Sequence, residues 1–332
     1  MSSTIWYQVD LAYKAFGSPF GKRAKIEVNM VKISVVINTL NEEQNLPRVL
    51  ASVRGLADEI IVVDMQSDDG TVKIAKEAGA RVYEHKKTGY VEPARNFAIG
   101  KATGDWILIL DADEELGEDL RNKIREIANS QESIDYYRIA RKNIIFGKWM
   151  QHSGWWPDYN IRLFKKGKVV WSEIIHSVPT NKGDGLDLAA NEELAITHHN
   201  YPDLTTYLAR MDNYTTIQAE LLQKEGKYHF VWRDLILKPA REFISRYFSG
   251  EGYKDGAHGL ALSLLQAFSE LVLYLKVWQS EKFQPQAITI DESLLLFTKL
   301  TKEINWWIAD INIKSKDIIS TLPDRIRRHF NE

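Results

Sequence analysis

The sequence predicts an α/β fold, in which helices cover both faces of a mostly parallel sheet, followed by a helical C-terminal region. Short β-branched runs alternate with helical segments between residues 33 and 110. This is the pattern of parallel strands joined by crossover helices. Polar residues directly follow three of the expected strands, and beyond residue 200 the apolar residues recur at helical spacing instead.

The first part of the chain is expected to contain four strands, because each is a short apolar run rich in β-branched residues. They cover residues 33–37, 60–63, 79–83 and 106–110. Helices are expected between them at about residues 41–54, 71–78 and 93–102. The turn at residues 68–71 supplies the aspartates, glycine and threonine that initiate the second of these helices.

The second part of the chain changes character near residue 200. Further strands are expected at residues 136–139, 160–164 and 169–171, and helices at 204–222, 230–247, 259–278 and 293–308. We therefore divide the chain into an N-terminal extension (residues 1–29), an α/β domain (30–200) and a helical C-terminal region (201–332).

The composition fits a globular protein with a sizeable core and excludes several classes of site. The net charge of −2 gives no basic field that would attract nucleic acid, so no nucleic-acid partner is expected. The chain contains no cysteine, which excludes disulfides, thiolate metal sites and a cysteine nucleophile.

The apolar segments give an expectation about location. The first residues lack the basic start and apolar run of a secretory signal. The longest apolar stretch, residues 257–278, contains Gln266, Glu270 and Lys276, so a buried or membrane-surface helix explains it better than a spanning one. We expect a cytoplasmic protein, either free or peripheral at the inner face of the membrane.

Polar side chains stand where the expected strands end. They are Thr39 and Asn41, then Asp64 and Ser67, then Asp111 and Asp113. In open α/β sheets, ligands bind at the carboxyl ends of the strands. A purely structural sheet has no need of carboxylates at two of these ends, so the sequence predicts a ligand site there.

The pair Asp111 and Asp113 suits a divalent metal. Alternate residues that leave a strand can converge on one ion, and hard oxygen ligands favour Mg²⁺ or Mn²⁺ shared with substrate phosphates. Such a metal would neutralise a leaving diphosphate. An acidic, solvated loop is the alternative reading of this pair taken alone.

Five ordered blocks give the sequence a specific resemblance. They cover residues 34–46, 62–71, 94–98, 104–105 and 110–113. In order and spacing they resemble family 2 glycosyltransferases, which have the GT-A fold, a Rossmann-like, mostly parallel sheet that binds a nucleotide-sugar donor. The resemblance implies a UDP-hexose donor and Mn²⁺ or Mg²⁺ as cofactor.

Later segments resemble the bacterial lipopolysaccharide-core branch of that family. They are residues 154–167, with Trp171 and His176, and residues 198–208. This branch transfers hexoses to core heptose or related acceptors, so the resemblance implies a bacterial glycan or glycolipid as acceptor. One position departs from the pattern, because Ser177 stands where relatives often carry glutamate.

The resemblance also implies roles for individual residues at the donor site. The donor-binding residues would be Thr39, Asn41, Glu42, Asp64, Ser67, Arg95, Asp111, Ala112 and Arg162. Among these, Asp64 would accept a hydrogen bond from the base, Arg95 would contact the pyrophosphate or the base, and Arg162 could pair with phosphate. Asp111 and Asp113 would bind the metal, with His198 or His176 as a candidate third ligand.

The acceptor side needs a base that removes a proton from the attacking hydroxyl. Asp158 is the first candidate, and Glu173 is the alternative. Because no covalent intermediate is needed, we expect inversion at the anomeric carbon. Trp155 and Trp156 could stack on the acceptor sugar, with core packing as the alternative for both.

Other functions remain open at this point. A polyprenyl phosphate or a protein or peptide could be the acceptor, and a nucleotide-sugar-binding scaffold is the non-enzymatic alternative. A sugar nucleotidyltransferase would need an early glycine-rich phosphate loop, and none lies between Ile33 and Pro47. The aromatic and basic C-terminal helices could contact a membrane or form a homo-oligomer.

Overall fold

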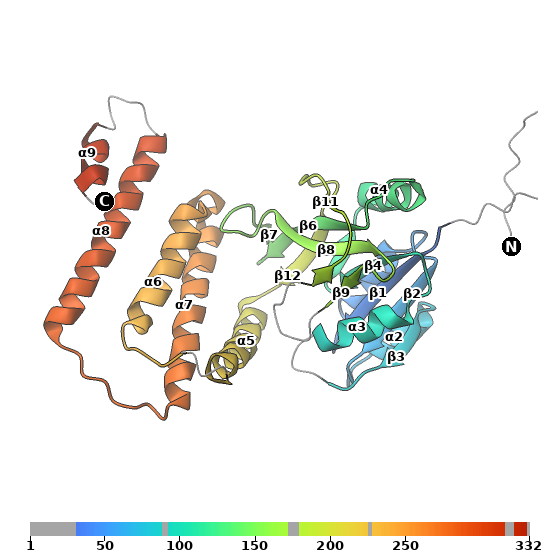
Figure 1. Ribbon diagram of the computed structural model, residues 1–332, viewed down its shortest axis with the longest axis horizontal. Coiled ribbons are helices and arrows are strands. Elements are labelled where there is room, and N and C mark those ends of the chain that lie inside the picture. The colour runs from blue at the N-terminus through green and yellow to red at the C-terminus, as the bar shows by residue number, and fades with distance from the viewer. Residues whose placement is uncertain (1–30, 88–91, 172–178, 225–227, 316–321, 331–332) are drawn as a thin grey trace, which may run out of the picture. The chain divides into compact units, whose positions relative to one another are not determined.

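The computed structural model describes residues 31–87, 92–171, 179–224, 228–315 and 322–330, and all that follows concerns these residues (Figure 1). The contacts between residues group Val31–Glu332 as one compact unit. The sheet strands end at Tyr201, and the first C-terminal helix begins at Leu204. The domain boundary expected near residue 200 stays a prediction.

The first four main strands form the parallel part of a ten-stranded sheet, in the order β3-β2-β1-β4. They are β1 (Ile33–Thr39), β2 (Glu59–Asp64), β3 (Arg81–Glu84) and β4 (Trp106–Asp111). The register pairs Thr39 with Asp64 and Asn38 with Asp111. The ends of three strands, each followed by predicted site residues, therefore lie side by side.

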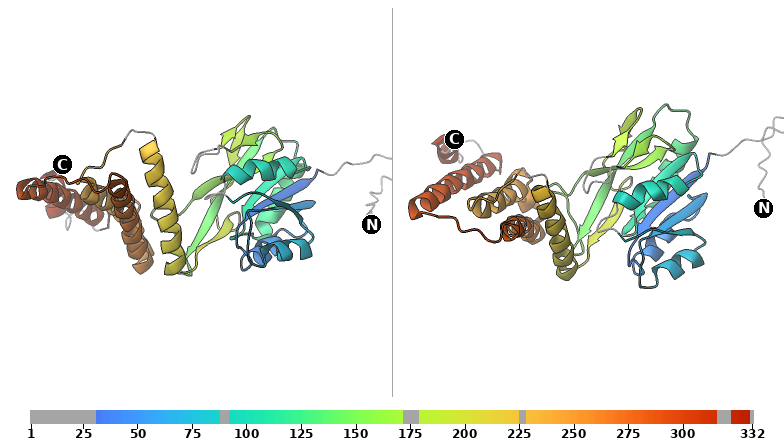
Figure 2. Two further views of the ribbon diagram at one scale, coloured as in Figure 1. Left: turned by 90° about the horizontal axis from the view of Figure 1, so that it is seen from below. Right: turned by 60° about the horizontal axis from the view of Figure 1, so that its bottom comes forward.

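Helices cover both faces of this parallel part (Figure 2). Helices α1 (Leu46–Ser52), α2 (Thr71–Glu77) and α4 (Glu118–Asn129) pack on one face, and α3 (Glu92–Lys101) packs on the other. Along β1, Val35 and Ile37 contribute to the first cluster and Val36 to the second. Burial on both faces explains why β1 is a continuous apolar run.

The rest of the sheet is mixed in direction. Next to β4 lie β8 (Asp158–Lys165), β6 (Tyr136–Ile145), β12 (Ile196–Tyr201) and β5 (Glu114–Leu116), in that order. Strand β8 is antiparallel to both neighbours, whereas β12 runs parallel to β6 and antiparallel to β5. Short strands β7 (Lys148–Trp149) and β11 (Gly185–Asp187) also pair with β6, and β9 (Val169–Val170) pairs with β10 (Thr180–Asn181).

The helical region consists of α5 (Leu204–Lys224), α6 (Asp234–Ile244), α7 (Ala257–Ser280), α8 (Ile290–Ser315) and α9 (Leu322–Phe330). A π-helical turn, η1 (Ser245–Ser249), and a 3₁₀ turn, η2 (Gly252–Asp255), join α6 to α7. Phe230 and Trp232 pack against Val277 of α7 in the core of this region. The α/β class with a C-terminal helical region is confirmed.

Helix α7 has the length and apolar composition that a membrane-crossing helix would need, and it is the one such helix among the described residues. A third of its most apolar window is buried inside the protein. Length and composition alone are weak grounds for a membrane span, and the core helices of globular proteins share these properties.

The structure differs from the sequence-based expectations at several points, and two of the larger differences lie before residue 130. The first helix begins at Leu46 rather than near residue 41, because residues 41–45 form turns that bond to the loop after β2. The segment from β5 through α4 was not expected from the sequence. Its signal is the helical spacing of Leu120, Ile124 and Ile127, all buried on the sheet.

Candidate active site

Four of the predicted donor residues meet at the ends of β1 and β2. The carboxylate of Asp64 accepts hydrogen bonds from Thr39 Oγ1 at 3.0 Å and from Ser67 Oγ at 2.6 Å. Its other oxygen accepts from the Ser67 backbone N at 2.9 Å, and Ser67 Oγ in turn accepts from the Asn41 backbone N at 2.8 Å. Asp64 is thus fixed in place by residues at the end of β1 and in the loop that follows β2.

A pocket of about 570 Å³ opens beside this cluster. Its walls are formed by Asp64, Gln66, Ser67, Val72, Lys76, Val82, Tyr83 and Glu84. The volume lies within the range of pockets that hold small ligands. Polar groups of both signs and one aromatic ring line the walls, which is a chemistry suited to a nucleoside.

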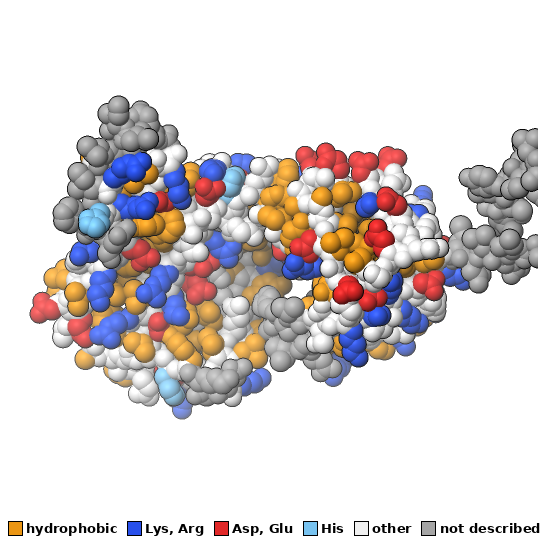
Figure 3. All heavy atoms as spheres, turned by 45° about the horizontal axis from the view of Figure 1, so that its top comes forward, with side chains coloured by type: hydrophobic (Ala, Val, Ile, Leu, Met, Phe, Trp, Pro, Cys, Tyr) orange, Lys and Arg blue, Asp and Glu red, His pale blue; other side chains and the backbone are white. Residues whose placement is uncertain are grey.

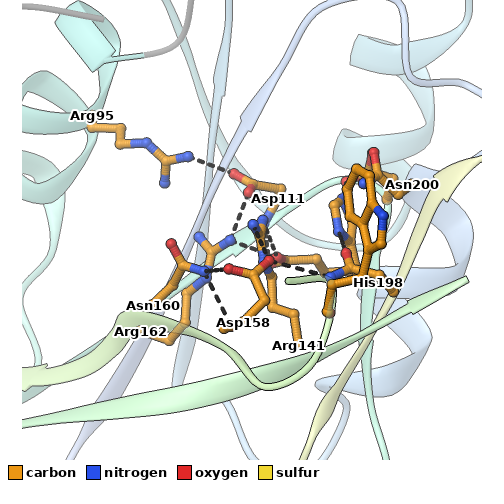
Figure 4. Close-up of polar contacts among 12 residues, drawn as sticks. Arg95, Asp111, Arg141, Asp158, Asn160, Arg162, His198 and Asn200 are labelled. Atoms are coloured by element: carbon orange, nitrogen blue, oxygen red, sulfur yellow. Dashed lines mark hydrogen bonds and ion pairs between the residues drawn. The ribbon is translucent and has the colours of Figure 1, made fainter. Parts of the chain in front are cut away.

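The second cluster lies at the end of β4 and centres on Asp111 (Figure 4). Arg95 Nη2 of α3 lies 2.8 Å from Asp111 Oδ1, and Arg162 Nη2 of β8 lies 2.7 Å from Oδ2. The same Arg162 nitrogen lies 2.5 Å from Glu114 Oε1, and Glu114 Oε2 accepts from the Asp111 backbone N at 2.9 Å. Both Asp111 oxygens therefore contact guanidinium groups.

The pKa values of Asp111 and Glu114 are shifted in opposite directions. Burial works against ionisation of Asp111, but the guanidinium groups of Arg162 and Arg95 hold its pKa well below the usual value. Burial raises the pKa of Glu114, which has no exposed surface, and the nearby charge of Asp111 raises it further. The arrangement carries two positive side chains at a site expected to receive a diphosphate.

Asp113 points to a different set of partners. His198 Nε2 of β12 lies 3.5 Å from Asp113 Oδ1, and Arg210 Nη2 of α5 lies 3.3 Å from Oδ2. Burial opposes ionisation, whereas His198 and then Arg210 lower the pKa of Asp113. Within the described part of the chain, no three His, Asp or Glu side chains are gathered closely enough to hold a metal ion.

The tautomer of His198 follows from its other ring nitrogen. Asn143 Nδ2 donates to Trp155 O at 2.8 Å and to Asp158 Oδ2 at 3.2 Å. Its Oδ1 therefore faces His198 Nδ1, at 2.6 Å, and accepts the ring proton. A neutral His198 then presents the lone pair of Nε2 toward the Asp113 carboxylate. Two acceptors that face each other need a proton or a cation between them.

Asp158, the candidate base, is held by three side chains at the start of β8 (Figure 4). Arg141 Nε and Nη2 lie 2.8 and 2.6 Å from Asp158 Oδ2, and Asn160 Nδ2 donates to Oδ1 at 3.1 Å. Although burial opposes ionisation, the charge of Arg141 and the hydrogen bond from Asn143 lower the pKa of Asp158. The carboxylate is ionised, as a base must be.

The two candidate acceptor tryptophans are partly covered by other side chains. Trp155 packs beside buried Ile145 and Met150, and Arg246 Cζ lies 5.7 Å from its ring centroid. Trp156 meets Trp149 edge-on, with ring centroids 5.2 Å apart. Both rings thus have packing roles, and their contact with a sugar stays a prediction.

The remaining predicted residues fall into two groups. Glu42 and Ala112 lie among the described residues. Glu42 Oε2 accepts a hydrogen bond from Asn45 Nδ2 at 2.9 Å, and Ala112 is buried in the main core cluster. Burial raises the pKa of Glu42, and the charge of Asp113 raises it further. Glu173 and His176 lie outside the described residues.

Four residues of the site were not identified from the sequence. They are Glu114, Arg141, Asn143 and Arg210, whose contacts link the carboxylates just described. Glu114 follows Asp113 directly, and its position was the available signal. Arg141 and Asn143 alternate along β6, which places both on one face of the strand. Arg210 gave no signal, because its partner is 97 residues away in the chain.

Comparison with known proteins identifies the family. The model for glycosyl transferase family 2 matches residues 34–183. An uncharacterized glycosyltransferase of Rickettsia typhi is 30% identical over 256 residues, covering 75% of this chain and 87% of the relative. The lipopolysaccharide core biosynthesis glycosyltransferase LpsC of Rhizobium meliloti is 25% identical over 270 residues, covering 79% and 97%.

Solved structures give more distant matches. The crystal structure of residues 1–349 of TarS from S. aureus is 13% identical, covers 78% of this chain and 94% of its own, and has a TM-score of 0.41. The two relatives are matched over 87% and 97% of their own length, and the family match includes the strand-end residues that gather at the edge of the sheet. The chain belongs to glycosyl transferase family 2, and the protein is a glycosyltransferase.

Proposed function

We propose that this glycosyltransferase is an inverting, metal-dependent hexosyltransferase that moves a hexose from a UDP-sugar to a hydroxyl of a bacterial glycan or glycolipid, such as lipopolysaccharide core. The main support is one juxtaposition. The Asp64 pocket and the Asp111 cluster with Arg95 and Arg162 lie at the ends of β2 and β4, the two strands that flank β1 in one sheet. One suits a nucleoside and the other its diphosphate.

The donor half of the proposal rests on charge and hydrogen-bond chemistry. Asp64 presents a carboxylate, oriented by Thr39 and Ser67, that can accept from the N–H of a uracil. Arg95 and Arg162 would contact the diphosphate, since a guanidinium binds phosphate oxygens in the same way as it binds a carboxylate. Asp111 holds both guanidinium groups before the donor arrives.

The metal proposal rests on Asp113 and His198. Their facing acceptors, Oδ1 and Nε2, are 3.5 Å apart, and a carboxylate with a neutral imidazole suits Mn²⁺. Oxygens of the donor diphosphate would complete the ligand set, as is usual for Mg²⁺ and Mn²⁺ sites with few protein ligands. The bound ion would neutralise charge on the leaving diphosphate. Asp111 and His176 remain further candidate ligands.

The acceptor half rests on Asp158 and the loop before it. Its ionised carboxylate, held by Arg141, can take the proton of an attacking hydroxyl. Asp158→Asn should abolish transfer while UDP still binds; normal turnover would remove Asp158 from the mechanism and leave Glu173. The similarity to LpsC over 97% of that protein supports a lipopolysaccharide-core acceptor.

If the acceptor is a glycolipid, the enzyme reaches it at a membrane surface, and the helical region would make that contact. The visible surface of the helical region carries hydrophobic side chains beside lysines and arginines (Figure 3). On α8, for example, Leu294, Leu295 and Phe297 are each more than half exposed. Such a surface suits an anionic bilayer, and binding to vesicles with and without phosphatidylglycerol would test it.

The deciding experiment measures release of UDP. The protein is incubated with UDP-glucose and UDP-galactose, with Mn²⁺ or Mg²⁺, in the absence of acceptor. We expect slow UDP release that needs the metal and that falls at least about tenfold in Asp113→Asn. Asp187→Asn, a change at an exposed aspartate of β11, is the matched control and should match the wild type. If no UDP-sugar binds and none is hydrolysed, the proposed donor is wrong.

A further inference from the structure

The helical region is bonded to the loop that carries the candidate acceptor residues. This loop, residues 150–157 between β7 and β8, contains Trp155 and Trp156 and is called here the tryptophan loop. It leads directly into Asp158. Its partners lie about 100 residues later, in the turns η1 and η2 and the glycines beside them. The contacts are hydrogen bonds to the backbone, which fix position more strictly than apolar packing does.

The first anchor is Asp255, the last residue of η2. Its carboxylate is buried, with 4% of the residue exposed. It accepts from the His152 backbone N at 2.9 Å and from the Gln151 backbone N at 3.2 Å, and it lies 3.1 Å from His152 Nδ1. Lys148 Nζ donates to the Asp255 carbonyl at 2.6 Å. One side chain thus caps the start of the tryptophan loop.

The second anchor is the pairing of Arg246 with Ser153. Arg246 Nη1 donates to Ser153 O at 2.7 Å, and Ser153 Oγ donates to Arg246 O at 3.0 Å. The Ser153 backbone N donates to Gly250 O at 2.7 Å. Ser153 has a φ of 60°, a conformation that costs a non-glycine residue energy. These three bonds to one residue compensate that cost.

Backbone contact leaves little freedom between the two segments. A Cβ on Gly252 would overlap Ser153 Oγ, and a Cβ on Gly259 of α7 would overlap the Gly252 carbonyl. The turns therefore approach both the tryptophan loop and α7 as closely as main chains can. Displacing the turns would displace the loop with them.

The far end of the tryptophan loop contacts the side chains that surround Asp158, the candidate base. Arg246 Cζ lies 5.7 Å from the Trp155 ring centroid, and the Trp155 carbonyl accepts from Asn143 Nδ2 at 2.8 Å. The same Asn143 amide also donates to Asp158 and accepts from His198. A shift of the loop would therefore move the candidate base and the proposed acceptor surface. Neither Asp255 nor Arg246 is among the described residues that line the Asp64 pocket.

We propose that Asp255 and Arg246 are positioning residues that hold the tryptophan loop for the acceptor, so that the helical region forms part of the acceptor site. The assignment of the acceptor to this loop rests on the proposed function. Changes at Asp255 and Arg246 should therefore weaken use of the acceptor and leave use of the donor intact.

The test compares Asp255→Asn and Arg246→Lys with the wild type in three measurements. Asp255→Asn replaces one carboxylate acceptor by an amide donor, and Arg246→Lys keeps the charge but loses the planar contact with Trp155. We expect hydrogen exchange of the Gln151, His152 and Ser153 amides to rise about tenfold. UDP release without acceptor should stay within about twofold. Transfer from UDP-glucose to lipopolysaccharide truncated at its core heptose should show a raised acceptor KM.

Matched controls are the same substitutions at exposed positions of the helical region, Arg241→Lys and Asp291→Asn. They should change none of the three measurements. Unaltered exchange in the tryptophan loop would overturn the proposal, and so would a fall in UDP release equal to the fall in transfer. Arg246→Lys is the milder change and serves if Asp255→Asn fails to fold. If the wild-type protein releases no UDP, the proposed function is wrong. Hydrogen exchange of the loop amides would then decide by itself whether Asp255 and Arg246 hold the loop.

Discussion

Asp113 Oδ1 lies 3.5 Å from His198 Nε2, and both residues are more than nine-tenths buried. Asp113 lies in the turn that leads into β5, and His198 lies on β12. Strands β5 and β12 pair antiparallel at the end of the sheet. Because Asn143 Oδ1 accepts a hydrogen bond from His198 Nδ1, the Nε2 atom faces Asp113 and needs a proton or a metal ion to join it to that carboxylate. This relationship leads to the first prediction.

Replacing His198 by alanine should weaken metal binding. We expect the Mn²⁺ concentration for half-maximal UDP release to rise by at least about tenfold, because one ligand is lost and Asn143 loses its partner. The measurement is a Mn²⁺ titration at fixed UDP-glucose. His229→Ala is the control, since the His229 side chain is 88% exposed. An unaltered titration curve for His198→Ala would show that this histidine does not bind the metal.

Removing Arg162 should destabilise the fold, because Arg162 pairs with buried Glu114 and half-buried Asp111. Arg162 and Glu114 are 3% and 0% exposed, so Arg162→Met removes the nearest cation from a buried carboxylate. We expect a loss of about 3–5 kcal/mol in the free energy of unfolding. The double variant Arg162→Met with Glu114→Gln should recover part of this loss. Urea unfolding measures both.

The control for that change is an exposed ion pair of the same type. Arg138 and Asp187 lie 2.6 Å apart with both side chains well exposed. Arg138→Met should cost no more than about 1 kcal/mol. Equal losses for Arg138→Met and Arg162→Met would contradict the idea that burial makes the Arg162 network costly to break.

The Asp158 carboxylate should make stability depend on pH in the acid range. Its pKa is lower in the folded protein than the usual aspartate value of about 3.8, so the folded state binds fewer protons there than the unfolded chain. The stabilisation is therefore present above about pH 4–5 and is lost as the pH falls through the folded pKa. Asp158→Asn should lower the free energy of unfolding at pH 6 more than at pH 3. A difference that is independent of pH would contradict the assigned direction.

Asp64 should determine the affinity for the nucleotide. Asp64→Ala removes the acceptor that Thr39 and Ser67 orient, and we expect the Kd for UDP to rise about tenfold or more. Calorimetry with UDP measures it. Glu84→Gln, at another carboxylate of the same pocket, tests specificity, because a general charge effect would raise the Kd for both variants alike.

The sequence was sufficient to predict the parallel half of the sheet, because strands buried on both faces are continuous apolar runs that local residues reveal. Thr39, Asp64 and Asp111 were assigned to strand ends, and the register of β1 with β2 and β4 shows that these ends lie side by side. The ordering of these strands needs only short crossover helices, so nearby residues carry the information.

The mixed part of the sheet and the helix after it were less accessible to this reasoning. The partners of Asp111 and Asp113 include Arg162 and Arg210, 51 and 97 residues away. Strand β12 alternates buried and half-exposed residues, yet it includes histidines and an asparagine that conceal the apolar pattern. Pairings of this kind depend on the assembled sheet and leave no periodic trace in the chain.

The place of β12 in the sheet has a consequence for dividing this protein into pieces. Strand β12 is an interior strand, paired on one side with β6 and on the other with β5. A fragment that stopped before Ile196 would expose two unsatisfied strand edges, which are templates for intermolecular pairing. Such a fragment should aggregate during expression, whereas one ending after Tyr201 keeps the edges closed. Swapping helical regions between relatives is therefore feasible only with a junction placed beyond β12.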